Sequence, residues 1–303
     1  MCIRDSLFQT HDEAQKLDPK TSEKFHHLTA KLLYLGKRAR PDIQLAVAFL
    51  CTRVAQPNIH DWKKLKRCLQ YLQANPTIPL VVDAADPHHI KWWVDASFAV
   101  HKDMKSHTGA TMTIGKGAVF SMSTRQRLNT KSSTEATLVG VDDAMPMVVW
   151  TRHFLQDQGY DTKDNVVYQD NQSAILLERN GMASSGRRTR HINIRYFFVH
   201  DRIKNGDLRV EYCPTDQMVA DFFTKPTQGA AFKRMRDLIM NNNQTPSGNE
   251  RIASQECVGA RRWADVAKGN NPMTDATALA TDANKTKPRK RENPRGSHNS
   301  TKL

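Results

Sequence analysis

Apolar residues in the first quarter of the chain recur every three or four positions, which is the spacing of one face of a helix. The first predicted helix starts after Ser22, a suitable cap, and ends at Gly36. Pro41 opens a second helix, and a third follows Pro57. Residues 23–80 are therefore predicted to form a helical segment.

From about residue 78 onwards, short apolar runs bounded by turn residues replace the helical spacing, which is typical of strands. A strand meander joined to crossover helices implies a mixed sheet with helices on its faces, an α/β fold. Pro146 is expected to bend or break the helix that contains it, because an interior proline disrupts helical hydrogen bonding. The predicted elements are strands 90–99, 108–114 and 118–123, helix 133–156, strand 165–169, helix 171–178, a helix carrying Ile192 and Ile203, strand 208–213, and helices from 217 and over 230–240.

Both ends of the chain lack this patterning. Residues 1–22 are predicted to be a disordered leader, of which 1–6 resemble translated sequencing adapter rather than natural coding sequence. After residue 240 the composition shifts to Asn, Gly, Ser, Thr, Pro and Lys, which predicts a disordered basic tail over 241–303. Its basic run 285–291 indicates a nuclear import signal, a loose nucleic-acid contact or a solvated charge cluster. A second folded part is expected over 88–240.

Charge narrows the choice of partner. The chain of 303 residues has 45 Lys and Arg against 31 Asp and Glu, and the resulting net charge of +14 favours a polyanion such as nucleic acid. A neutral body with a basic tail is the alternative. The five cysteines form no CxxC pair, so a disulfide framework or zinc ribbon is not expected and a reducing compartment fits. No apolar run approaches the roughly 20 residues that cross a bilayer, and the N-terminus lacks a signal-peptide core, so no membrane partner is expected.

Four carboxylates stand in comparable local settings. Asp95 and Asp170 each follow an apolar, strand-like run, whereas Glu135 and Asp221 lie early in predicted helices. Because strand ends and helix starts can converge at one edge of a mixed sheet, we expect these four side chains to meet. Clustered carboxylates need a cation to stay ionised, and Mg²⁺ prefers their oxygens. Two such ions about 4 Å apart can hold the attacking and leaving oxygens of a phosphodiester, with Asp95 as a bridging ligand.

Each acid also has a purely structural interpretation. Glu135 can form a capping box with Ser132, and Asp170 can cap the helix after it. Asp221 can favour the positive start of a helix, and Asp95 can end a strand at a turn. A single explanation that covers all four acids favours the metal site.

The other residue types offer no competing site. The histidines at 88, 89, 101 and 107 lack a matching set of metal-binding partners, and most of them are expected to be exposed. Ser133 and Thr134 have no histidine and acid in a triad order, so a serine-type hydrolase is not expected.

Six short motifs then occur in one order, and together they carry a resemblance. The chain resembles the C-terminal part of the Pol polyprotein of copia-type LTR retrotransposons: residues 88–227 are similar to its ribonuclease H domain and 23–80 to the helical end of its reverse transcriptase. The motifs are Arg40-Pro-Asp-Ile43, Trp92-Trp-Val-Asp-Ala-Ser97, Ser132-Ser-Thr-Glu-Ala136, Gln169-Asp-Asn-Gln-Ser-Ala-Ile175, Arg190-His-Ile-Asn-Ile-Arg-Tyr196 and Ala220-Asp-Phe-Phe-Thr-Lys-Pro226.

The resemblance implies a ribonuclease H-like fold with a five-stranded mixed sheet and hydrolysis of the RNA strand of RNA–DNA hybrids during reverse transcription. It implies that Asp95, Glu135, Asp170 and Asp221 are catalytic and hold two Mg²⁺ ions, with Mn²⁺ as a substitute and no small-molecule cofactor. The rest of a Pol polyprotein is a further expected partner, in a cytoplasmic retroelement particle or in the nucleus. The residues expected to bind nucleic acid are Arg125, Arg127, Lys131, Asn171, Arg188, Arg190 and His191.

The chain departs from this family pattern in several places. No Tyr-x-Asp-Asp motif occurs, so polymerase activity is not expected from this chain. The segment 214–217 has no histidine, and Thr137 stands where the family often has a second acid. Two alternatives therefore stay open: a catalytically silent, nucleic-acid-binding remnant, and a transposase-like nuclease that cuts duplex DNA.

Overall fold

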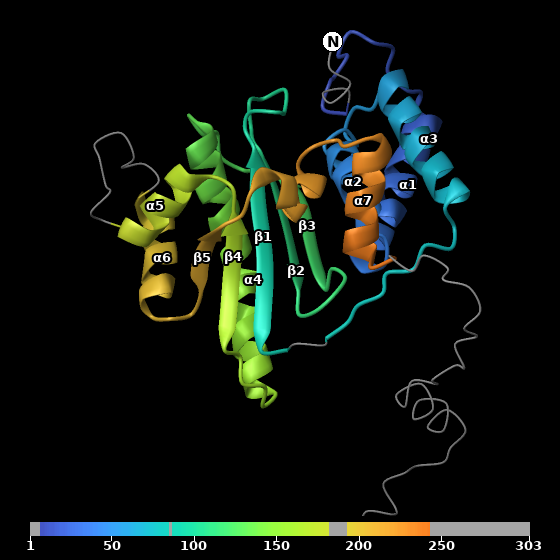
Figure 1. Cartoon of the computed structure of the whole chain (residues 1–303). Helices are drawn as coiled ribbons and strands as arrows, with labels where there is room; N and C mark the ends of the chain where they lie inside the picture. Colours follow the sequence, from blue (N-terminus) through green and yellow to red (C-terminus); the bar gives the residue numbers. More distant parts are fainter. Residues whose placement is uncertain (1–6, 85–86, 182–192, 243–303) are drawn as a thin grey trace, which may run out of the picture. The chain divides into compact units, whose positions relative to one another are not determined.

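The computed structural model describes residues 7–84, 87–181 and 193–242. The predicted helical segment contains three helices and a short 3-10 turn, and the predicted sheet and its helices follow (Figure 1). In order, the elements are α1 (Pro19–Arg38), η2 (Pro41–Ile43), α2 (Gln44–Cys51), α3 (Ile59–Ala74), β1 (His89–Ser97), β2 (His107–Thr113), β3 (Phe120–Arg125), α4 (Ser133–Asp157), β4 (Asp164–Gln169), α5 (Gln172–Asn180), α6 (Asn193–Lys204), β5 (Arg209–Tyr212), η5 (Thr215–Gln217), η6 (Val219–Phe223) and α7 (Gly229–Met240).

The five strands form one mixed sheet in the order β3-β2-β1-β4-β5. The first three strands pair antiparallel as a meander, and β1 pairs parallel with β4, as β4 does with β5. The parallel pairs need crossovers, which α4, α5 and α6 supply. This order and register confirm the predicted ribonuclease H-like α/β fold.

The side chains of β1 point alternately to the two faces of the sheet, and each face packs against different elements. Trp92 and Val94 are buried in the main core together with Val141 and Met145 of α4, which packs on this face. Successive strand residues point to opposite faces, so the neighbouring Trp93 lies on the other face. It packs there with residues of β4 and η6. The face opposite α4 is therefore the one on which polar side chains can be presented.

The N-terminal region is more ordered than predicted. The helix α1 begins at Pro19 with Asp18 as its cap, rather than at Ser22. It also passes through Gly36, where it packs against Ile43 and Gln44. The leader preceding it was predicted to be disordered, and from residue 7 onwards that prediction is wrong.

The physical reason lies in one aromatic side chain and one lysine. Phe8 is only 8% exposed and belongs to the core of the helical segment, with an edge-on contact to Phe49. The ammonium of Lys64 donates to the backbone carbonyls of Leu7 and Gln9, at 2.8 and 2.6 Å. Burial of an aromatic ring and satisfied backbone carbonyls fix this segment despite its polar composition.

The predicted helical segment and the predicted sheet domain lie within one compact unit, Met1–Gln244. Contacts between them include the amide of Gln44, which donates to Ser121 Oγ of β3 at 2.7 Å. The ring of Tyr71 in α3 meets that of Phe232 in α7, with 5.6 Å between centroids. The predicted tail, apart from residues 241 and 242, lies outside the described residues.

The break expected at Pro146 does not occur, and the helix predicted around Asp221 is of another type. The helix α4 runs unbroken past Pro146, with Met145 and Val148 on its buried face. The segment around Asp221, predicted to be an α-helix, is instead the 3-10 helix η6. Among the residues that the structure describes, no helix combines the length and the apolar character needed to span a membrane.

Candidate metal centre

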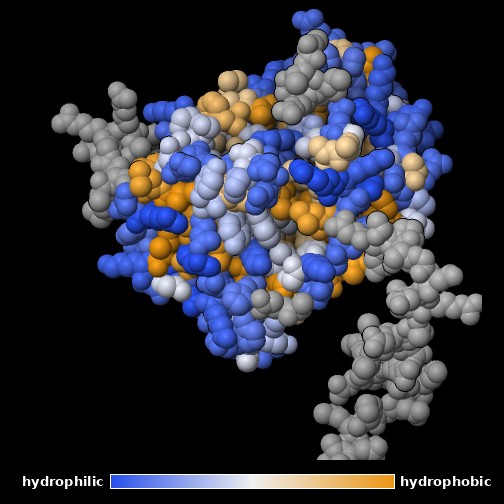
Figure 2. All heavy atoms as spheres, viewed as in Figure 1, coloured by the Kyte–Doolittle hydropathy of each residue, from blue (hydrophilic) through white to orange (hydrophobic). Residues whose placement is uncertain are grey.

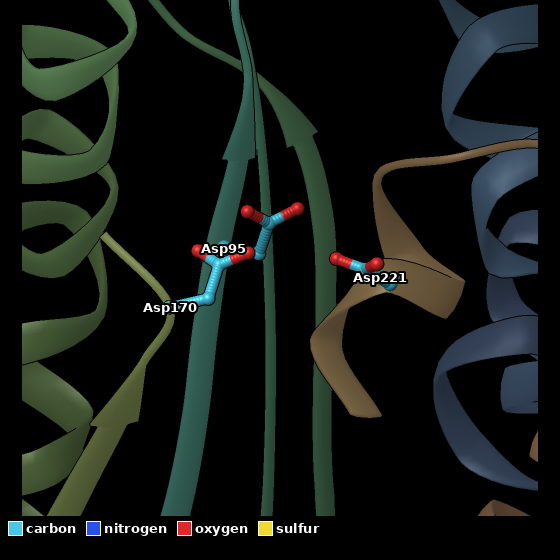
Figure 3. Close-up of side chains that lie close together, drawn as sticks. All are labelled: Asp95, Asp170 and Asp221. Carbon is cyan, nitrogen blue, oxygen red and sulfur yellow. The ribbon is translucent and has the colours of Figure 1, made fainter. Parts of the chain in front are cut away.

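Three of the four predicted acids lie together. One carboxylate oxygen from each of Asp95, Asp170 and Asp221 can be chosen so that all three lie within 4.8 Å of one another (Figure 3). No other group of this kind occurs among the described residues. The three acids come from β1, from the residue after β4, and from η6, so residues far apart in the chain build one site.

Strand register explains the meeting of Asp95 and Asp170. In the parallel pair β1 and β4, Trp93 lies beside Tyr168, and their rings stack with centroids 5.5 Å apart. Two residues further along each strand direction, on the same face, come Asp95 and Asp170. The same face of adjacent parallel strands thus presents an aromatic pair followed by a pair of acids.

A glycine makes room for the third acid. Gly109 of β2 pairs with Asp95 across the antiparallel register. A Cβ atom at this position would lie 2.6 Å from Thr224 Cγ2 and 3.0 Å from the carbonyl oxygen of Ala220. Only a residue without a side chain lets η6 lie this close to the sheet, which is how Asp221 reaches Asp95.

Two of the three acids, Asp95 and Asp221, are buried, Asp170 is half-buried, and hydroxyl groups hydrogen bond to Asp95 and Asp170. Asp95 is 5% and Asp221 8% exposed. The hydroxyl of Thr224 donates to Asp95 Oδ2, and that of Thr215 donates to Asp170 Oδ2 at 3.1 Å. These hydroxyls fix the carboxylates while leaving other oxygen lone pairs for a ligand.

A lysine completes the cluster. Lys225 Nζ lies 2.6 Å from Asp221 Oδ1 and 3.6 Å from Asp95 Oδ2. Burial, and then the charge of Asp95, raises the pKa of Asp221 to about 7, even though Lys225 acts in the opposite direction. Burial tends to lower the pKa of Lys225, but Asp95 and Asp221 together raise it. Three carboxylates that lie this close together, two of them buried, fit a divalent metal site through their oxygen atoms.

Glu135 is placed differently. It lies in the first turn of α4, is 8% exposed, and is not a member of the three-acid group. Its Oε2 accepts a hydrogen bond from the backbone N–H of Lys131 at 2.8 Å, and its own N–H donates to Ser132 Oγ at 3.2 Å. These two hydrogen bonds lie at the start of α4 and resemble the capping box, which is the structural alternative to metal binding for Glu135. Metal binding by Glu135 stays a prediction.

The residues predicted to bind nucleic acid fall into three sets. Arg125, Arg127 and Lys131 are exposed, and Arg125 also pairs with Asp103 at 3.1 Å. Asn171 caps α5 by accepting from the N–H of Ala174 at 3.1 Å, so its side chain has a structural role. The remaining three, Arg188, Arg190 and His191, lie outside the described residues.

A groove lies on the same face of the sheet as the acids. It has a volume of about 630 Å³, and the stacked Trp93 and Tyr168 and the half-exposed Tyr212 line it together with Lys91 and Arg234. Hydrophobic and hydrophilic side chains alternate over the surface seen in this view (Figure 2). Aromatic faces between cationic side chains can contact nucleic-acid bases and phosphates.

Gly109, Thr224 and Lys225 contribute to the three-acid cluster but are not among the site residues predicted from the sequence. The last two stand inside a recognised motif, but that motif does not reveal which acids they contact.

The expectation that most of the histidines at 88, 89, 101 and 107 are exposed is wrong. His88 and His89 are half-buried. His101 and His107 are 6% and 0% exposed, with Nε2 of the first 3.0 Å from Nδ1 of the second.

Comparison with known proteins finds related Pol polyproteins. The Retrovirus-related Pol polyprotein from transposon TNT 1-94 of Nicotiana tabacum is 30% identical over 240 residues, 76% of this chain and 18% of that protein. The corresponding polyprotein from transposon RE1 of Arabidopsis thaliana is 30% identical over 225 residues, 74% of this chain and 15% of that protein. This chain therefore spans less than a fifth of the length of either.

A shorter protein matches part of the same region. Secreted RxLR effector protein 161 of Plasmopara viticola is 31% identical over 120 residues, which is 39% of this chain and 84% of that protein. No protein-family model matches the chain. Among solved structures, the LC11-RNase H1 isolated from compost aligns at 12% identity and a TM-score of 0.34 over 45% of this chain and 92% of that one. Strand order and register, not this score, establish the fold.

Proposed function

The chain belongs to the Pol polyproteins of copia-type retrotransposons, and from that premise we propose that it is a ribonuclease H that hydrolyses the RNA strand of RNA–DNA hybrids. The observation that carries the proposal is the meeting of Asp95, Asp170 and Asp221 within 4.8 Å on a ribonuclease H-like sheet. A nuclease of this class needs such a site, because a phosphodiester is cleaved through oxygens that carry negative charge.

The three aspartates would hold Mg²⁺, with Mn²⁺ as a substitute, since all of their donor atoms are hard oxygens. When bound, Mg²⁺ supplies an activated water and neutralises charge on the scissile phosphate. The chain's own contribution is positional. Thr224 and Thr215 hold Asp95 and Asp170, and the close packing of η6 at Gly109 brings Asp221 to them. Glu135 is proposed as a fourth acid, although it lies outside the three-acid group.

Contacts to the hybrid are proposed for the exposed cations near the start of α4. Arg127 and Lys131 precede that helix, and Arg188, Arg190 and His191 are assigned to the same task from the sequence alone. Recognition would rest on groove shape and on 2′-hydroxyl groups rather than on base edges. The products expected are a 3′-hydroxyl and a 5′-phosphate.

The deciding experiment uses a labelled RNA–DNA hybrid with Mg²⁺. We expect the parent chain to cut the RNA strand, and Asp170→Asn to lose at least about 100-fold in rate, since removing one group that stabilises transition-state charge costs about 10²–10³. Asp157→Asn, the same substitution at an exposed acid that ends α4 and lies outside the three-acid group, is the matched control and should keep the parental activity.

Three results would change the assignment. Equal cleavage by Asp170→Asn and the parent would remove Asp170 from the centre. Binding of the hybrid without cleavage would indicate a silent nucleic-acid-binding remnant. Preferential cutting of duplex DNA would indicate a transposase-like nuclease.

A further inference from the structure

The motif that supplies Asp221 also supplies a cation aimed at the same cluster. Lys225 Nζ contacts oxygens of two of the three acids, at 2.6 Å from Asp221 Oδ1 and 3.6 Å from Asp95 Oδ2. The proposed hydrolysis assigns no task to this ammonium. A divalent ion held by the same acids would be repelled by it, because two positive charges a few ångströms apart interact strongly at a partly buried site.

We propose that Lys225 is an internal counter-ion of the metal centre: it neutralises Asp95 and Asp221 in the metal-free protein and is displaced from them when a divalent cation binds. The inference rests on the proposed metal centre, and it goes beyond it by assigning a competitor for the ion within the chain itself.

The backbone around Lys225 is anchored, so displacement requires movement of its side chain only. The N–H of Lys225 donates to the carbonyl of Asp221 at 2.8 Å. The carbonyl of the preceding Thr224 accepts from Ser97 Oγ of β1 at 3.1 Å, and Thr224 is only 1% exposed. This short segment is therefore tied both to η6 and to the sheet.

The side chain itself has a way out. The side chain of Lys225 is 42% exposed, whereas those of its partners Asp95 and Asp221 are 6% and 11% exposed. A lysine ammonium on a four-carbon stem can leave buried acids for water without moving its own Cα atom. Asp95 stays in place, because Thr224 also holds it. The carboxylates of Asp95 and Asp221 thus form a buried anionic site, and the ammonium of Lys225 can move from it into solvent.

The first test measures Mn²⁺ binding by calorimetry on the full chain, so it does not depend on cleavage. Lys225→Met, which removes the charge and keeps a side chain of similar length, should bind Mn²⁺ about tenfold more tightly than the parent, equivalent to about 1.4 kcal/mol. Lys225→Arg keeps the charge and should bind Mn²⁺ with nearly parental affinity. Lys102→Met removes a lysine paired with Asp12 outside the cluster, and it should leave the affinity unchanged.

The second test separates a counter-ion from an ordinary structural ion pair. Without metal, Lys225→Met should melt at a lower temperature than the parent, because two buried acids lose their cation. At saturating Mn²⁺ this difference should disappear, since the ion replaces the lysine. A difference that persists at saturating Mn²⁺ would assign Lys225 a structural role only and would overturn the inference. Lys225→Gln serves as a second neutral variant if the methionine variant does not fold.

The outcomes for the inference and for the proposed function are distinguishable. Parental Mn²⁺ affinity in both neutral variants overturns the role of Lys225 and leaves the metal centre intact. Mn²⁺ binding that tightens as expected, in a protein that does not cut the hybrid, supports the inference and removes the hydrolysis. Absence of Mn²⁺ binding in the parent and in both neutral variants overturns the inference together with the metal centre.

Discussion

Glu178 shows how strongly one buried carboxyl can depart from its behaviour in water. The residue is 0% exposed, and its two oxygens accept from Gln169 Nε2 at 3.1 and 2.9 Å. The Oε1 atom of Gln169 is buried too and has no hydrogen-bond partner within the described ranges. Burial raises the pKa of Glu178 to about 8, although Gln169 and Arg179 act in the opposite direction. Glu178 therefore keeps its proton at neutral pH.

This raised pKa gives a prediction for stability. Between about pH 5 and pH 8 the unfolded chain has released the proton of Glu178, whereas the folded chain retains it. The free energy of unfolding must then fall as pH rises, by up to about 1.4 kcal/mol per pH unit. Glu178→Gln lacks this proton, so we expect it to be more stable than the parent at pH 8, with the advantage shrinking towards pH 5. Urea denaturation across this range measures it.

The control for that series is Glu23→Gln, because Glu23 is an exposed residue of α1. Its unfolding free energy should follow the parent at every pH. If the curves of Glu178→Gln and the parent stay parallel between pH 5 and pH 8, Glu178 does not retain its proton in the folded chain.

Gly109 gives a second prediction about a single residue. An alanine there would place its Cβ atom 2.8 Å from Phe223 Cβ and 3.0 Å from the carbonyl oxygen of Ala220. Because a backbone carbonyl cannot rotate away, η6 must move off the sheet, and we expect Gly109→Ala to lose about 1–3 kcal/mol of stability and most of its Mn²⁺ affinity. Gly140→Ala, whose Cβ would meet neighbours no closer than 3.4 Å, should lose neither. Calorimetry measures the Mn²⁺ affinity of both variants, and urea denaturation measures their stability.

The hairpin of β2 and β3 is tied to η6 by a directed chain of hydrogen bonds. Ser123 Oγ donates to the carbonyl of Phe223 at 2.8 Å, so it must accept from Nε2 of His107, also at 2.8 Å. Nδ1 of His107 then accepts from Nε2 of His101. This direction requires the imidazole of His107 to be neutral, because its Nδ1 accepts a hydrogen bond. The chain helps to hold the element that carries Asp221.

The buried histidine pair predicts acid sensitivity. Burial lowers the pKa of His107 to about 3 and that of His101 to about 4. Below about pH 6.5 the unfolded chain takes up protons that the folded chain does not. Stability is therefore present above that pH and is lost as pH falls, by about 4 kcal/mol for the pair at pH 5. His107→Gln does not titrate at this position, so its unfolding free energy should fall less steeply than that of the parent between pH 7 and pH 5. Equal slopes would contradict the buried, neutral His107.

Element type was predictable here wherever one face of an element is buried continuously. The alternation in β1 and the helical spacing of α4 both report burial against the same core, so periodicity alone located them. Where local rules failed, tertiary packing outweighed them. Gly36 does not end α1, because side chains of Ile43 and Gln44 pack on it. Pro146 does not interrupt α4, whose neighbouring Met145 is fully buried.

Only those parts of the candidate site that depend on neighbouring residues in the sequence were predictable. Asp95 and Asp170 each follow an apolar run, which the sequence shows. The parallel register of β1 and β4 then places the two acids side by side. The part played by Lys225 depends on a distance to Asp95, 130 positions earlier, and no local pattern encodes that distance. Glu135 illustrates the opposite limit: its motif is specific, yet the same spacing also serves the start of a helix.

The compact unit of residues 1–244 joins the helical segment to the sheet through several independent contacts. α2 packs against β3, where Gln44 donates to Ser121. Phe232 of α7 meets Tyr71 of α3 on one side and Phe222 of η6 on the other, at 5.6 and 5.2 Å between centroids. The same α7 accepts a hydrogen bond from the N–H of Val81 at the carbonyl of Met240. The helical segment thus supports the elements that surround the candidate metal centre.

We therefore expect the ribonuclease H-like part to need the helical segment for its stability. A fragment of residues 87–244 would expose the faces of β3 and α7 that α2 and Tyr71 cover, and apolar surface left in water lowers stability. Compared with residues 1–244, it should melt at least about 5–10 °C lower or unfold without a cooperative transition. The single change Phe232→Ala within residues 1–244 should reproduce part of this loss, about 1–3 kcal/mol, because it removes the ring shared by α3, α7 and η6. Equal melting temperatures for the two fragments would show that the sheet and α7 fold independently of the helices that precede them.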